Sequence, residues 1–147
     1  MRLSLGHHQA LTGLDTNVLV RYIMQDDAAQ SALATRCIES LRPDAPGFVS
    51  SIALVELNWV LATAYRLSRE QVAQACEALL SAREIIVQDA ETAWRALRLF
   101  RSSTADLADC LIERGGVAAG CEHTVTFDRG AARDCGMILL TDFRSLA

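Results

Sequence analysis

The sequence predicts an α/β domain in which a mostly parallel sheet carries helices on both faces. Short apolar runs, typical of buried strands, alternate along the chain with longer segments whose apolar residues recur at helical spacing. The 147 residues are enough for one domain with a buried core. Because 51% of the residues are hydrophobic and 22% are charged, the composition is that of a folded protein. Right-handed connections between parallel strands then predict a three-layer α/β/α sandwich.

In the first half of the chain, the predicted strands are short apolar runs and the predicted helices follow capping residues. Strands are expected over residues 11–15 and 48–49. Helices are expected over residues 18–23, from a cap at Asp26 or Asp27 to about residue 41, and over residues 52–65 after a cap at Ser50 or Ser51. Residues 42–47, with two prolines and a glycine, predict a loop.

The second half continues the alternation. Ser68 and Gln71 form a capping-box pattern that opens one helix, and a face with Trp94 and Phe100 marks the next. Strands are expected over residues 84–87, 123–127 and 137–141, and helices from Thr104 or Ala105 onward and over residues 131–135. The domain is therefore expected over residues 12–141, with a disordered N-terminal extension over 1–11 and a tail over 142–147.

Residues 45–65 carry a single charge, Glu56, and are apolar enough to be compared with a membrane span. A carboxylate at mid-span costs roughly 3 kcal/mol on insertion scales, and Pro46 and Gly47 also interrupt the segment. We therefore expect a strand end and a buried helix, and no membrane span. Trp59 is expected in the core, with an interface as the alternative.

Charge and cysteine usage exclude several classes of protein. The net charge of −4 argues against a broad basic surface for nucleic acid, although it leaves room for a small local site. All 14 basic residues are arginines, so the lysine that a P-loop needs is missing. The five cysteines form no CxxC pair, which argues against a structural zinc site or a disulfide framework and fits a reducing cytoplasm.

Two predicted strands end in an aspartate, Asp15 and Asp128. Ligands of parallel sheets bind beyond the carboxyl ends of the strands, so both carboxylates are candidates for one site. The alternative, which is the stronger for each residue taken singly, is that each aspartate caps the next helix.

The helix that begins near residue 105 also carries acids. Leu107, Ala108, Leu111 and Ile112 are expected to form its apolar stripe, with Asp106, Asp109 and Glu113 clustered on the opposite side. Each pair of like charges at this spacing destabilises a helix by roughly 0.2–0.5 kcal/mol. A bound cation would relieve the repulsion, and a solvated face would tolerate it, so both readings stay open.

Glu56 is the third acidic position, because it lies among apolar residues and is expected to be buried. A buried carboxylate must be paired, protonated or bound to a metal ion, and pairing with an arginine is the structural alternative. Taken together, acids from separate segments favour an all-oxygen pocket for Mg²⁺ or Mn²⁺. Such a cation would activate a water molecule and reverse the local charge for a polyanionic substrate.

Four short motifs resemble those of the PIN domain, a compact α/β nuclease domain, and in particular the toxin subunit of VapBC-type toxin–antitoxin pairs. Each motif places an acidic residue in a setting typical of the family, and the four motifs follow one another in the family's order. They read GLDTNVLVRY, SSIALVEL, ADLADCLI and TVTFDR. The resemblance covers the chain from about residue 12 to residue 141 and implies a PIN-like α/β/α sandwich.

By position, the resemblance implies that Asp15, Glu56, Asp109 and Asp128 are the catalytic residues and metal ligands. It implies metal-dependent hydrolysis of RNA that leaves a 5′-phosphate and a 3′-hydroxyl. Asp106 would be an accessory carboxylate, and Asn17 and Thr126 would hydrogen-bond within the site. The glycines at 115 and 116 depart from the family pattern and predict that the third helix is shortened or kinked there.

Arg129 and Arg133, four residues apart, are candidates for RNA phosphate contacts, with ordinary surface arginines as the stronger alternative. The resemblance also implies a VapB-type antitoxin lying across the hairpin of helices near residues 52–65 and 68–82, and a homodimer. Two competing functions remain: a non-catalytic PIN-like module that binds RNA or protein, and a structure-specific DNA nuclease.

Overall fold

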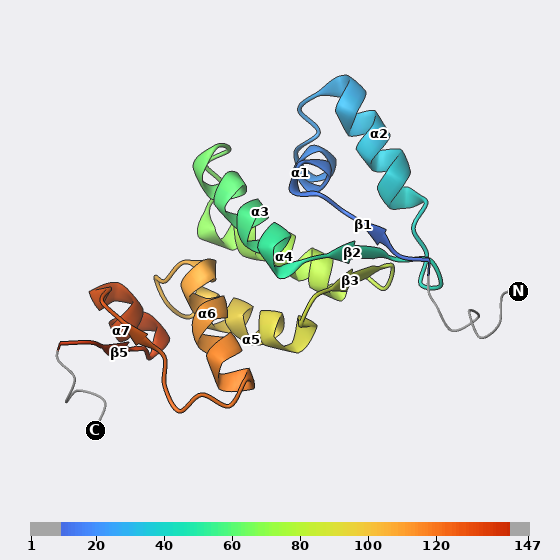
Figure 1. The fold of residues 1–147 in the computed structure, drawn as a ribbon. Helices are drawn as coiled ribbons and strands as arrows, with labels where there is room; N and C mark the ends of the chain where they lie inside the picture. The colour runs from blue at the N-terminus through green and yellow to red at the C-terminus, as the bar shows by residue number, and fades with distance from the viewer. Residues whose placement is uncertain (1–9, 142–147) are drawn as a thin grey trace, which may run out of the picture. The chain divides into compact units, whose positions relative to one another are not determined.

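The computed structural model describes residues 10–141, and the chain divides into two compact units, Met1–Ala90 and Glu91–Ala147. Each unit is described by itself below (Figure 1). The predicted tail over residues 142–147, and all but the last two residues of the predicted N-terminal extension, lie outside the described residues.

The first unit contains a three-stranded parallel sheet in the order β1-β2-β3. Its strands are β1 (Thr12–Gly13), β2 (Gly47–Val49) and β3 (Ile85–Val87), with Thr12 opposite Gly47 and Gly47 opposite Ile85. Four helices connect and follow the strands: α1 (Thr16–Met24), α2 (Ala28–Glu39), α3 (Ser51–Thr63) and α4 (Arg69–Ser81). Helix α1 packs against α2 and α3, and α3 packs against α4.

The second unit contains α5 (Ala90–Arg101), whose first residue is the last of the first unit, and α6 (Leu107–Ala118). It continues with β4 (Val125–Thr126), α7 (Arg129–Cys135) and β5 (Ile138–Leu139), and the two strands pair in parallel. The α/β class with parallel strands is therefore confirmed. Most of the strands are shorter than predicted, because the apolar runs extend beyond the few residues that pair in each ladder.

The helix starts follow the capping chemistry of the sequence. Asp27 caps α2 and Ser50 caps α3, each through a side-chain oxygen that accepts a backbone N–H of the first turn. Ser68 and Gln71 form both hydrogen bonds of a capping box at α4. These three predicted starts are confirmed.

Helix α3 differs from the prediction in the face that it buries. Leu54, Leu57 and Leu61 are buried, whereas Trp59 is 64% exposed and Ile52 is 79% exposed. The prediction that Trp59 lies in the core is wrong. Because apolar residues surround this helix on every side, periodicity alone does not identify the buried face.

No helix within residues 10–141 is long and apolar enough to cross a membrane.

Helix α6 also differs from its prediction in two respects. Its buried residues are Leu107 and Cys110, while Ile112 is 57% exposed, because the small thiol of Cys110 packs in the core where α6 meets α7. The helix also runs through Gly115 and Gly116 to Ala118 without shortening. A Cβ at Gly116 would lie 2.7 Å from the Thr124 hydroxyl oxygen, so this glycine admits a close approach of the following loop.

Candidate active site

Asp15 and Glu56 line the same pocket of the first unit, which has a volume of about 790 Å³. Asp15 stands directly before α1, and Glu56 lies in the middle of α3, so the packing of α1 against α3 brings two distant acids to one pocket. The predicted accessory residue Asn17 lines it as well.

Asp15 is the N-cap of α1. Its Oδ1 accepts a hydrogen bond from the Thr16 backbone N–H at 2.8 Å. Its other oxygen, Oδ2, accepts no hydrogen bond from any described residue, and the side chain is exposed. One oxygen of Asp15 therefore stabilises the helix start while the other remains available to a ligand.

Glu56 is exposed, so the prediction of a buried carboxylate is wrong. The apolar neighbours in the sequence point to other sides of α3, because successive helical residues are about 100° apart. The Thr16 hydroxyl donates a hydrogen bond to Oε1 of Glu56. Glu56 thus needs no buried arginine, and a buried threonine orients it.

The second unit holds the other predicted acids. The pKa of Asp109 is raised, first by partial burial and then by the charges of Asp106 and Asp128. Asp109 is therefore close enough to Asp106 and to Asp128 for both charges to act on it. Asp106 is the N-cap of α6, and its Oδ1 accepts the Asp109 backbone N–H at 2.8 Å.

Asp128 is the N-cap of α7, because its Oδ1 accepts the backbone N–H groups of Gly130 at 2.7 Å and Ala131 at 3.2 Å. The predicted accessory residue Thr126 accepts the Asp128 backbone N–H through its hydroxyl oxygen at 3.0 Å. Thr126 therefore helps to fix the turn that presents Asp128.

Of the other charged candidates, Glu113 forms an ion pair with the adjacent Arg114 at 3.2 Å. Arg133 forms two hydrogen bonds to the neighbouring Asp134, at 3.1 and 3.2 Å, which raise its pKa. Arg129 is exposed at the first position of α7. Both arginines therefore lie on the short helix after Asp128, and Arg133 already has a carboxylate partner.

Among the other side chains that line the pocket of Asp15 and Glu56, the three largest were missed as site residues: Arg21, Trp59 and Tyr65. Helical spacing could have found two of them. Arg21 follows Asn17 by one turn of α1, and Trp59 follows Glu56 by one turn of α3. Tyr65 lies beyond the end of α3, where no local pattern indicates it.

The chemistry of the acids fits a hard divalent cation. Carboxylate oxygens are the ligands that Mg²⁺ and Mn²⁺ prefer, and a bound cation would relieve the repulsion around Asp109. Within residues 10–141, no group of three or more Asp, Glu, His and Cys residues is arranged to hold a metal ion. Asp15 and Glu56 belong to the first unit, whereas Asp109 and Asp128 belong to the second.

In a comparison with known protein families, residues 14–134 fit the model of the PIN domain. This range includes all four predicted catalytic acids. A search of curated proteins found no match.

Proposed function

The chain belongs to the PIN domain family, and from this premise we propose that it is a Mg²⁺-dependent endoribonuclease. PIN domains are generally nuclease modules that use divalent metals. The observation that supports the proposal most directly is the position of Asp109 near Asp106 and Asp128, where partial burial and then the charges of these two carboxylates raise its pKa. Repulsion between carboxylates lowers the free energy of unfolding. A cation that binds at these acids would offset this decrease.

By position in the family motifs, Asp15 and Asp109 would be the principal metal ligands, and Glu56 and Asp128 would bind the metal or orient its water molecules. When bound, the cation activates water and polarises a phosphoryl oxygen of the RNA. Thr16 holds one oxygen of Glu56, and the caps of α1 and α7 fix the positions of Asp15 and Asp128. One carboxylate of the set accepts the proton of the attacking water.

Cleavage of a structured RNA, with Mg²⁺ and with EDTA, tests this proposal. We expect cleavage only with the metal, products with 5′-phosphate ends, and a loss of about 100-fold or more in Asp109→Asn. Glu122→Gln, which changes an exposed acid of the same unit, is the matched control. Cleavage in EDTA, or full activity of Asp109→Asn, would refute the assigned mechanism.

A non-catalytic PIN-like module that binds RNA is the second candidate. It is favoured by the capping roles of Asp15, Asp106 and Asp128, each of which has a structural reason to be acidic. This candidate predicts RNA binding that does not depend on metal and is not followed by cleavage. The same assay, read with labelled RNA on a native gel, separates the two.

We further propose that the protein is a VapC-type toxin whose antitoxin lies across the hairpin of α3 and α4. The support is the exposed apolar surface of Ile52 and Trp59 on α3, beside Glu56. An arginine of the antitoxin would pair with the acids and block metal binding. Co-expression with the product of the adjacent reading frame should give a stable complex that does not cleave RNA, and light scattering should show whether the chain alone is the expected homodimer.

A further inference from the structure

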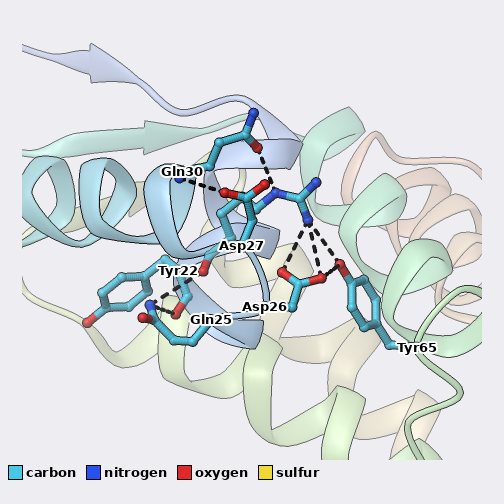
Figure 2. A network of polar contacts seen from close by, with 7 residues as sticks. Tyr22, Gln25, Asp26, Asp27, Gln30 and Tyr65 are labelled. Atoms are coloured by element: carbon cyan, nitrogen blue, oxygen red, sulfur yellow. Dashed lines mark hydrogen bonds and ion pairs between the residues drawn. The ribbon is translucent and has the colours of Figure 1, made fainter.

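Arg21 is held at the pocket wall by side chains from three segments of the first unit. Its Nε donates to Oε1 of Gln30 at 2.7 Å, and its Nη1 donates to Oδ1 of Asp26 at 3.2 Å. The same Nη1 donates to the hydroxyl oxygen of Tyr65 at 3.1 Å. Figure 2 shows Gln30, Asp26 and Tyr65 arranged around this guanidinium group.

Asp26 and Tyr65 also bind each other. The Tyr65 hydroxyl donates to Oδ2 of Asp26 at 2.6 Å, which closes a triangle of hydrogen bonds with Arg21. This bond lowers the pKa of Asp26 and raises the pKa of Tyr65. At neutral pH, Asp26 is therefore ionised and Tyr65 is neutral, so the triangle stays intact.

Arg21 is the only basic side chain among the described residues that line the pocket of Asp15 and Glu56. Hydrogen bonds hold the Arg21 side chain in place. The side chain is still 29% exposed, so it reaches solvent. A guanidinium group has five N–H donors, and the described hydrogen bonds of Arg21 use Nε and Nη1. No described residue accepts a hydrogen bond from Nη2, which remains available to an anion in the pocket.

We propose that Nη2 of Arg21 binds a phosphate oxygen of the RNA strand in this pocket, and that Asp26 and Tyr65 are positioning residues that hold the guanidinium group for it. The inference rests on the proposed ribonuclease function and adds a substrate contact to it. Arginine suits this role because its donors lie in a fixed plane that matches phosphate geometry. A network that only ties the helices together would affect stability and leave RNA binding unchanged.

The first test compares the kinetics of Arg21→Gln and Tyr65→Phe with those of the wild type, using RNA and Mg²⁺. We expect Arg21→Gln to raise KM about tenfold with little change in kcat, as for the loss of one charge-assisted hydrogen bond. Tyr65→Phe, which keeps the ring and loses only the hydroxyl, should raise KM about threefold. Arg36→Gln, an exposed arginine of α2 that does not line the pocket, is the control and should change neither constant.

The second test measures RNA affinity against salt concentration in an Asp109→Asn background, which does not require turnover. Removing one phosphate contact should lower the slope of log K against log salt by about 0.7 for a single strand. If the wild type does not cleave RNA, the proposed function fails, and the salt slope still tests the Arg21 contact. Unchanged KM and salt slope in both Arg21→Gln and Tyr65→Phe, with only a loss of stability, would overturn the inference.

Discussion

The hydroxyl of Thr16 donates a hydrogen bond to Oε1 of Glu56 across 40 positions of the sequence. It joins the first residue of α1 to the middle of α3. Thr16 is buried and Glu56 is exposed, so the bond restrains one carboxylate oxygen and leaves the other directed to solvent and ligands. The two predicted site acids of the first unit are thus linked, because Thr16, which binds Glu56, directly follows Asp15.

Replacing the Thr16 hydroxyl should weaken metal binding more than it weakens the fold. Thr16→Val keeps the shape but loses the donor, and Glu56 then rotates freely in solvent. We expect a loss of about 1 kcal/mol or less in the free energy of unfolding, measured with urea, because the freed carboxylate is still hydrated. Mn²⁺ affinity, followed by titration calorimetry, should fall. Thr16→Ser is the control, and equal Mn²⁺ affinity in both variants would contradict this role for the hydroxyl.

The two roles of Asp128 should separate in two substitutions. Asn is as good an N-cap as Asp, so Asp128→Asn should keep the free energy of unfolding within about 0.5 kcal/mol of the wild type. Asp128→Ala loses the hydrogen bonds to Gly130 and Ala131 and should cost about 1 kcal/mol. Both variants should lose RNA cleavage, since both remove the charge. A fully active Asp128→Asn would assign the residue to capping alone.

The raised pKa of Asp109 makes this residue a source of instability in metal-free buffer. Below its ordinary pKa of 3.8, the carboxyl is protonated in both the folded and the unfolded chain and does not change the free energy of unfolding. As the pH rises through the higher pKa of the folded state, ionisation favours unfolding. Asp109→Asn should therefore be more stable than the wild type at neutral pH, by about 0.2–0.5 kcal/mol from the loss of its repulsion with Asp106, three residues earlier.

Thermal unfolding in EDTA at pH 3.5 and pH 7 measures this difference, which should be present only at the higher pH. Added Mn²⁺ should raise the midpoint of the wild type and leave that of Asp109→Asn unchanged. Glu122→Gln should follow the wild type throughout. A wild type that is the more stable protein in EDTA at pH 7 would show that Asp109 is not repelled by its neighbours.

The two adjacent glycines of α6 should respond in opposite directions to the same change. No atom lies within 4 Å of a Cβ at Gly115, so Gly115→Ala should stabilise the helix by about 0.5–1 kcal/mol. A Cβ at Gly116 would lie 2.7 Å from the Thr124 hydroxyl oxygen, so Gly116→Ala should be destabilising by about 1 kcal/mol or more. Urea unfolding measures both. The double variant Gly116→Ala/Thr124→Ala should recover stability, and its failure to do so would place the strain elsewhere.

Local chemistry predicted the parts of the fold that depend on neighbouring residues. The capping box of Ser68 and Gln71 and the cap at Ser50 depend on hydrogen bonds that span three residues, so the sequence displays them directly. The buried face of α3 was not predictable in the same way, because its apolar residues surround the helix. Trp59 and Glu56 were both assigned to the wrong environment for this reason.

The candidate site was predictable to the extent that it follows strand ends and helix caps. Asp15 and Asp128 each stand at such a junction, whereas Glu56 and Asp109 were chosen from the motif order, and their place in the site stays a prediction. Arg21 could have been found from its position one turn after Asn17, but its partner Tyr65 could not, because the two residues are 44 positions apart in the sequence. Contacts of this kind arise from packing of whole helices and leave no short-range signature.

The exposure of Trp59 supplies the protein with its own optical probe. An indole ring in water emits fluorescence at long wavelength, and covering it shifts the emission to the blue. Because Trp59 lines the pocket of Asp15 and Glu56, any chain that enters this pocket, whether nucleic acid or polypeptide, should report its arrival without a dye.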